Sequence, residues 1–393
     1  MATDLSSPVA EKERTAAVGE LPEKACPVPS AGEGRLVSLD TFRGFIMFWI
    51  AAGGGAVVTK LLALRPNALS NFLLTQLDHS IWSGLHFYDC IWPSFMLMVG
   101  ISIPLSFAKR SRTQTYPQML RHAVIRFAII FLLSSLRGSI DVGSPEWIEL
   151  SGVLQPIAIA YLVAFLLVRK PQWVQAAVGT SILAANVLIM AFASAPGVPA
   201  GSYQEMANIV RYVDLRTIGR TYDPGNTGGV GGSILCIWFP VPTTILGMLI
   251  GEWLMRARSK AGKVKIIAGA GLLCLAVGYA ISPLVPVIFK LITASFVLVS
   301  AGWACLMFLL FYWAIDVRGY RKWTLPLVVI GANSIFIYML SSFVRLHYVV
   351  GIFTRAIAGT SGRLEPLLQA VVVLVVQWLM LFWMYRNRIL IKA

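Results

Sequence analysis

Residues 78 to 107 read "DHSIWSGLHFYDCIWPSFMLMVGISIPLSF". This stretch opens with carboxylates and imidazoles and continues into an apolar run long enough to cross a membrane, for which about 20 residues are needed. Ionisable side chains are costly in lipid, and they are retained there mainly where they line a cavity or pair with a partner. This stretch therefore predicts a functional group at the mouth of a membrane-spanning helix.

The composition of the whole chain is typical of an integral membrane protein. Of its 393 residues, 57% are hydrophobic and only 13% are charged, whereas soluble domains are about a quarter charged. The formal charge of +15 does not predict a nucleic-acid partner, because Lys and Arg accumulate in the cytoplasmic loops of polytopic membrane proteins. The five cysteines are scattered without CxxC spacing, which indicates neither a disulfide framework nor a zinc site.

We expect an all-α, polytopic transmembrane bundle. Residues 1–34 are polar and predict a disordered cytoplasmic tail rather than a signal peptide, and residues 35–393 form the transmembrane domain. Residues 344–358 predict an additional interfacial or re-entrant helix. About ten segments meet the length criterion for spanning, namely 42–62, 87–108, 120–137, 151–168, 174–193, 234–255, 264–282, 291–315, 324–343 and 366–385.

The connections between these segments predict the orientation in the membrane. Lys and Arg concentrate in alternate, short connections, whereas the other set is longer and sparser in both. Under the positive-inside rule this pattern places both termini in the cytoplasm. His79 then lies on the outer side. The basic connections are 109–121, 169–170, 256–265, 317–322 and 386–393.

Asp40 and Arg43 lie where "RLVSLDTFRG" becomes the first span. A spacing of three places them on one helical face, where the two side chains can pair. One interpretation is an interfacial ion pair at the end of the helix. The other is a contact to substrate or phosphate at the cytoplasmic mouth, for which an arginine is the best-suited side chain.

The more specific candidates for a catalytic site are His79, Asp78 and Asp89. Imidazole is the usual general base near neutral pH, and a nearby carboxylate can fix its tautomer. A purely structural histidine at the membrane interface is the competing interpretation. A metal cluster of His86, Asp89 and Cys90 can be drawn, but no further ligand spacing supports it, so no metal is expected. Cys90 in an apolar helix is typical of a small buried hydrophobe rather than a nucleophile.

Four uncharged polar residues lie at the ends or in the interiors of expected spans: Gln155, Ser295, Asn333 and Ser334. Residues of this kind usually bridge neighbouring helices, and together they can also line a shared cavity. Gly247 and Gly251 form a GxxxG pattern, which predicts a close approach of two helices without indicating any chemistry.

These residues carry a resemblance to a known family. "RLVSLDTFRGF", the 78–107 stretch, "GVLQPIAIAYL", "YDP" and "YWAIDVRGYRKWTLPLVVIGANSIFIY" follow one another as they do in the heparan-alpha-glucosaminide N-acetyltransferase family. The similarity runs from about residue 35 to the end of the chain. Its most specific part is the pattern H-x-x-W-x-G-L-x-x-x-D-x-x-x-P, matched by His79, Trp82, Gly84, Leu85, Asp89 and Pro93.

The resemblance implies transfer of an acetyl group from cytoplasmic acetyl-CoA to an amino sugar or related glycan across the membrane. It implies that His79 is the catalytic base and that Asp89 or Asp78 orients its ring. The donor would contact Asp40, Arg43, Gln155, Ser295, Asn333 and Ser334. The luminal domain and first helix of the family's lysosomal enzyme have no counterpart here, as expected of a bacterial inner-membrane form. The resemblance also implies a homodimer.

Three positions depart from the pattern that the family usually shows. Pro156 follows Gln155 where the family carries an arginine, and Gly225 follows Asp223–Pro224 where an acid is common. Ile292 stands at a position that is commonly tryptophan. All three fall at expected donor or acceptor contacts, so they bear on the identity of the acceptor and on activity rather than on the fold.

Two other functions compete with the acetyltransferase. A permease of amino sugars or cell-wall fragments would use the same polar groups for passage and His79 for proton coupling. Against it, the chain shows neither a visible internal repeat nor a carboxylate in mid-span with a clear partner. A catalytically inactive membrane scaffold is favoured only by the three departures.

Overall fold

The computed structural model describes residues 36–149, 152–219, 221, 234–257, 259–344, 346–358 and 364–391. In this part of the chain the regular elements are helices, accompanied by two isolated β-bridges. The all-α fold class is therefore confirmed. The expected tail, residues 1–34, and the departure at Gly225 lie outside the described residues.

The elements follow one another as α1 (Val37–Ile50), α2 (Gly54–Ala63), α3 (Ala68–Gln76), the 3-10 turn η1 (Tyr88–Cys90), α4 (Ile91–Arg110), α5 (Tyr116–Val142), α6 (Leu154–Leu167), α7 (Gln172–Phe192), α8 (Ile209–Thr217), α9 (Val241–Arg256), α10 (Lys260–Ile281), α11 (Ala294–Tyr312), the π-turn η2 (Trp313–Val317), α12 (Leu325–Ala332), α13 (Ser334–Phe343), α14 (Leu346–Ala358) and α15 (Glu365–Arg386). The predicted extra helix near residues 344–358 is thus present as α14.

The helices support fewer spans than the expected ten. In the described residues, six helices are long and apolar enough to cross a membrane, and the total is eight if each of two bent pairs is one span. The segments expected at 151–168 and 234–255 form α6 and α9, which have only 14 and 16 residues. At a rise of 1.5 Å per residue, such helices are shorter than the apolar thickness of a bilayer.

Both bent pairs break at residues with irregular backbone. Helices α1 and α2 meet at 55°, next to Gly53, whose φ is 79°. Helices α12 and α13 meet at 72°, and Asn333 lies at that bend. The buried Asn333 amide donates to the carbonyl of Ile389 and accepts from the N–H of Ile391 at 3.1 and 2.9 Å. This asparagine therefore holds the segment that follows α15 against the bend.

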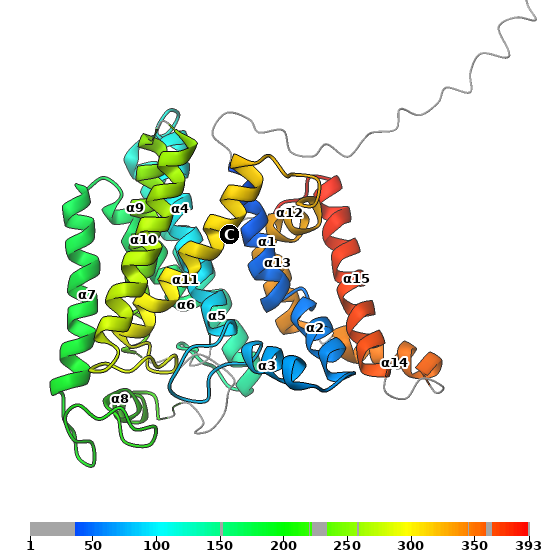
Figure 1. The fold of residues 1–393 in the computed structure, drawn as a ribbon, viewed down its shortest axis with the longest axis horizontal. Coiled ribbons are helices and arrows are strands. Elements are labelled where there is room, and N and C mark those ends of the chain that lie inside the picture. Colours follow the sequence, from blue (N-terminus) through cyan, green and yellow to red (C-terminus); the bar gives the residue numbers. More distant parts are fainter. Residues whose placement is uncertain are drawn as a thin grey trace, which may run out of the picture.

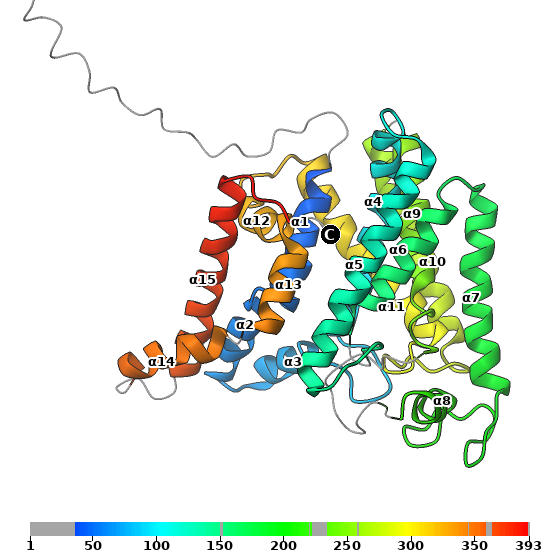
Figure 2. The same cartoon turned by 180° about the vertical axis from the view of Figure 1, so that it is seen from behind.

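The chain alternates between two ends of the bundle (Figure 1). The connections α4–α5, α6–α7 and α9–α10, all rich in Lys and Arg, lie at one end together with the start of α1 and the end of α15. The short helices α3, α8 and α14 lie at the opposite end, as the view from behind also shows (Figure 2). The connections that are rich in Lys and Arg in the sequence thus lie together at one end of the bundle.

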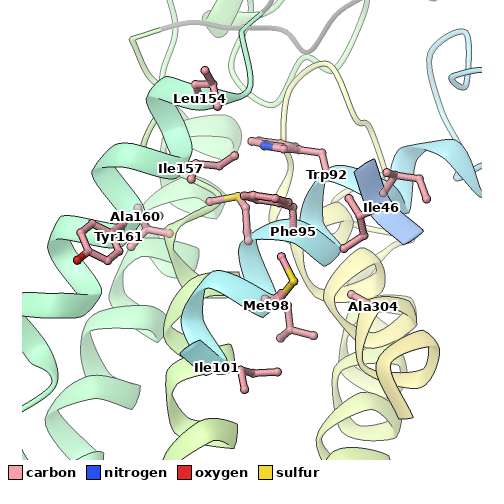
Figure 3. Close-up of a cluster of buried hydrophobic side chains, with 14 of the residues drawn as sticks. Ile46, Trp92, Phe95, Met98, Ile101, Leu154, Ile157, Ala160, Tyr161 and Ala304 are labelled. Atoms are coloured by element: carbon pink, nitrogen blue, oxygen red, sulfur yellow. The ribbon is translucent and has the colours of Figure 1, made fainter. Parts of the chain in front are cut away.

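Helix α4 is the centre of the packing. It contacts α1, α6, α9 and α11, and most of its residues from Ile91 to Pro104 are buried. Trp92, Phe95, Met98 and Ile101 of α4 pack with Leu154 and Ile157 of α6 and with Ile46 of α1 (Figure 3). The helix that begins two residues after Asp89 is therefore the one around which the other helices pack.

Glycines allow α4 and α9 to pack with their backbones in contact. A Cβ atom on Gly247 would lie 2.1 Å from the carbonyl oxygen of Leu97, and one on Gly251 would lie 2.7 Å from that of Ile101. The close approach predicted from the GxxxG pattern is confirmed. Gly100 of α4 faces the same contact, since its Cβ would lie 2.1 Å from the Thr244 oxygen.

We expect Gly247→Ala to separate α4 from α9 and to lower the stability of the protein. Overpacking of this kind costs about 1–3 kcal/mol, which a thermal unfolding curve in detergent would register. Gly269→Ala on α10 is the matched control, because no atom lies within 4 Å of its added Cβ. Equal unfolding temperatures for the two variants would contradict the packing described here.

Candidate functional site

The loop between α3 and η1 carries His79 and is held by hydrogen bonds to two other segments, at Val287 and at Tyr203. The Gly84 N–H donates to the Val287 carbonyl at 2.9 Å, beside an isolated β-bridge between Ser83 and Ile288. The Trp82 indole N–H donates to the Tyr203 carbonyl at 3.0 Å. Gly84 has a φ of 118°, a conformation that suits glycine. Trp82 and Gly84 of the family pattern thus have structural roles in fixing the loop.

Asp89, in the turn η1, is the most completely enclosed acidic group of this loop. Its side chain is 0% exposed. One carboxylate oxygen lies 2.6 Å from Nδ1 of His79, and the other accepts from the backbone N–H groups of His86 and Ser80 at 2.9 and 3.3 Å. A buried carboxylate is tolerated only with such partners. Asp89 therefore joins the loop to the start of α4.

The geometry around His79 leaves one ring nitrogen for chemistry. Because an ionised carboxylate can only accept, we infer that Nδ1 carries the proton and donates to Asp89, which leaves the Nε2 lone pair of a neutral ring available. The ring stacks on Phe289 with centroids 4.5 Å apart and meets Tyr88 edge-on at 4.8 Å. The side chain keeps 18% of its surface exposed. This is a fixed, partly accessible imidazole, as a general base requires.

The structure gives the other candidates in this loop different roles. The Asp78 carboxylate accepts from the backbone N–H of His79 at 2.8 Å, so Asp89 rather than Asp78 contacts the ring. His86 Nδ1 lies 3.0 Å from the Asp78 carbonyl. Cys90 Sγ contacts the His86 carbonyl at 3.8 Å. Among the residues that the structure describes, no group of three His, Cys, Asp or Glu side chains is arranged to hold a metal.

A buried lysine lies beside the ring that stacks on His79. Lys290, the neighbour of Phe289, is 2% exposed, and its ammonium lies 3.4 Å from a carboxylate oxygen of Glu205. The same ammonium lies 6.0 Å from the centre of the Trp82 ring. Neither Lys290 nor Glu205 was predicted from the sequence. The only indication in the sequence was the single charge of Lys290 in the apolar run "PLVPVIFKLITASF". A charged residue in such a run is costly and is usually functional.

The loop before α11, which carries Phe289, is held by buried hydrogen bonds. The hydroxyls of Thr293 and Ser295 both donate to the Pro286 carbonyl, at 2.8 and 3.0 Å. Asn186 of α7 donates to the Ile292 carbonyl and accepts from the Ala294 N–H. The Ser295 hydroxyl thus helps to hold this loop in place through its bond to the Pro286 carbonyl.

Ile292 has a left-handed backbone, with a φ of 47°, and is almost completely buried. This conformation is unusual for a β-branched residue. The departure at Ile292 therefore falls in the loop that supports the His79 ring.

Gln155 belongs to a second buried polar cluster. Its amide accepts from the Glu149 N–H at 3.1 Å and donates to the Trp147 carbonyl and the Ser135 hydroxyl at 2.7 and 3.0 Å. The Glu149 carboxylate is bound by the Arg137 guanidinium, and Arg137 also donates to Ser342 of α13 at 3.1 Å. The cluster therefore contains a cation, Arg137, although residue 156 is proline where the family usually carries an arginine. Arg137 and Glu149 were not singled out in the sequence.

Asp40 and Arg43 form the predicted i,i+3 pair, with 3.4 Å between the charged atoms. Both side chains are partly exposed, at 22% and 27%. They lie near the start of α1, at the end of the bundle away from the His79 loop (Figure 1). Asn333 lies at the bend described above, and Ser334 is the first residue of α13. The structure thus distributes the candidate residues over both ends instead of gathering them in one place.

We expect Glu205→Gln to destabilise the protein because it removes a carboxylate partner of the buried Lys290 ammonium. Breaking a buried pair from one side costs up to about 3 kcal/mol, measurable as a lower unfolding temperature in detergent. Adding Lys290→Met removes the buried charge as well and should restore most of the loss. If the double variant is no more stable than Glu205→Gln alone, the pair does not provide this stabilisation.

Comparison with known proteins identifies the part of the chain that carries this site. Residues 35–213 match the family model for heparan-alpha-glucosaminide N-acetyltransferase, catalytic. The match includes His79, Asp89 and Gln155, and it confirms the resemblance found in the sequence over these residues. No curated protein matches the chain. Together with the apolar helices, the match indicates a multi-pass membrane protein of acetyltransferase type.

Proposed function

We propose that this protein transfers an acetyl group from acetyl-CoA to an amine or hydroxyl of an amino sugar or related glycan, with His79 as the general base. The observation that carries the proposal is the 2.6 Å contact between His79 Nδ1 and the buried Asp89 carboxylate. It lies within the part of the chain that matches an acetyltransferase family.

The proposed reaction uses the free nitrogen of His79. Nε2 removes a proton from the acceptor amine as that amine attacks the thioester carbonyl carbon, which forms the new carbon–nitrogen bond. The carbon–sulfur bond then breaks, and the CoA thiolate leaves with the proton that His79 has accepted. The Asp89 carboxylate holds the ring in place and stabilises the imidazolium while it exists.

The stacked Phe289 ring supports the orientation of His79 from a second direction. Hydrogen bonding to Asp89 fixes one edge of the imidazole, whereas Phe289 lies 4.5 Å from its centre with an interplanar angle of 11°. Two constraints of this kind limit rotation about both side-chain torsions. Catalytic groups held in this way contribute more than mobile ones, because orientation is already achieved before substrate binds.

The two ends of the bundle suit a donor and an acceptor that approach from opposite sides. Arg43 and Asp40 lie at the end with the basic connections, where we propose that they contact the charged part of acetyl-CoA in the cytoplasm. The loop that follows α3 and carries His79 lies at the other end (Figure 1), which would face the acceptor. We propose that Gln155, Ser295 and Asn333 position the surrounding segments, since each uses its polar atoms within the protein.

We expect His79→Gln to abolish acetyl transfer and acetyl-CoA hydrolysis in purified protein without loss of acetyl-CoA binding. Removal of a general base typically lowers the rate about 10²- to 10⁴-fold. Binding is measured by calorimetry and turnover by release of CoA thiol. His122→Gln is the matched control, because His122 is an exposed histidine of α5 near the opposite end of the bundle.

Asp89→Asn separates positioning from proton transfer in the same assay. The amide retains the size of the side chain and can present its NH2 group to Nδ1, which favours the wrong tautomer. We expect a lower turnover with unchanged acetyl-CoA affinity. No binding at millimolar acetyl-CoA, or full turnover in His79→Gln, would contradict the proposed function. Uptake of intact amino sugar into proteoliposomes without CoA would then favour a permease.

A further inference from the structure

A cavity of about 490 Å³ lies at the end of the bundle opposite the His79 loop. It is formed by the last turns of α4 and α9 and by the short connection between α6 and α7. None of its lining residues belongs to the candidate site described above. Several of them are exposed, among them Arg169, Lys170, Met255 and Arg256, so the cavity is open to the surroundings.

Three cationic side chains contribute to the walls: Arg169, Lys170 and Arg256. They come from two segments that are far apart in the sequence, and one carboxylate, Glu252, lies among them. Three cations against one carboxylate leave this cavity positively charged. Guanidinium groups bind phosphate oxygens in pairs, and a lysine adds a mobile point charge.

The negative charge of Glu252 is directed toward the protein. Its two oxygens accept from the amides of Gln175 and Gln172 at 2.8 and 2.9 Å. Arg256 lies 3.9 Å away from the same carboxylate and is itself 69% exposed. The carboxylate is 12% exposed. Glu252 therefore anchors the first turn of α7. Arg256 also donates to the Gln172 side-chain oxygen at 3.3 Å, and the Arg169 guanidinium lies over the Tyr116 ring, 4.7 Å from its centre.

The remaining lining is apolar and lies at the level where membrane helices end. Pro104 and Phe107 of α4 and Met255 of α9 contribute to the walls. Next to the cavity, Trp173 in the first turn of α7 is 73% exposed. Tryptophan gathers at membrane–water interfaces. A molecule that fits this cavity should therefore carry both an anionic group and apolar chains.

We propose that this cavity binds the phosphate group of an anionic phospholipid. The phosphate lies on Arg169, Lys170 and Arg256, and the apolar part of the lipid lies against Phe107 and Met255. Basic pockets between membrane helices are a recurring way of holding such headgroups. A soluble phosphate compound shares the anionic chemistry but gains nothing from the apolar wall, and this difference separates the two sources experimentally.

The test uses the full chain in detergent with phosphatidylglycerol or phosphatidylcholine added, and it follows lipid binding by native mass spectrometry and by thermal unfolding. We expect phosphatidylglycerol to bind more tightly and to raise the unfolding temperature more. The triple variant Arg169→Gln, Lys170→Gln, Arg256→Gln should weaken phosphatidylglycerol binding about a hundredfold, since each of the three cations near a headgroup contributes roughly fivefold. It should leave phosphatidylcholine binding unchanged.

The matched control is Arg110→Gln, Arg112→Gln, Arg121→Gln, which removes the same charge from the same end of the bundle outside the cavity. Equal phosphatidylglycerol binding by wild type and the cavity variant, or equal losses in the two variants, would overturn the proposal. Displacement of phosphatidylglycerol by micromolar inorganic phosphate or CoA would show a soluble phosphate ligand instead. Because the readout is lipid binding, it does not depend on the proposed acetyl transfer.

Discussion

The structure depends on the burial of one carboxylate at the point where the central helix begins. Asp89 is fully enclosed, yet both of its oxygens have partners: the His79 ring on one side and two backbone N–H groups on the other. Without them the cost of burying the charge would be several kcal/mol. The loop of residues 77–87 must therefore fold back over the start of α4, and this return brings the imidazole into position.

The surrounding segments maintain this arrangement through contacts that are far apart in the sequence. The loop before α11 supplies Phe289 beneath the imidazole and the Val287 carbonyl for Gly84, while Tyr203 holds Trp82. Lys290 and Glu205 join those two supporting segments to each other. Helix α4 cannot shift independently, because α9 packs against its backbone at Gly247. A rigid central helix and a clamped loop thus position His79 together.

Much of the fold was predictable because apolar length and Lys/Arg placement report directly on membrane helices. The number of spans was not predictable from the sequence. Helices α6 and α9 are shorter than their apolar segments, and the bends at Gly53 and Asn333 depend on tertiary contacts. His79 and Asp89 were found because charge is rare beside an apolar helix. Phe289, Glu205 and Arg137 lie far from them in the sequence, so no local pattern indicated their roles. The GxxxG contact was predictable because small residues are its only requirement.

We propose that His79 completes a transfer between substrates on opposite sides of a membrane. The most direct measurement uses sealed proteoliposomes with glucosamine inside and radiolabelled acetyl-CoA outside, and it follows labelled N-acetylglucosamine trapped in the lumen. We expect lumenal product with wild-type protein and none with His79→Gln, while acetyl-CoA stays outside. Product that forms only when both substrates share one side, or equal product from the variant, would contradict it.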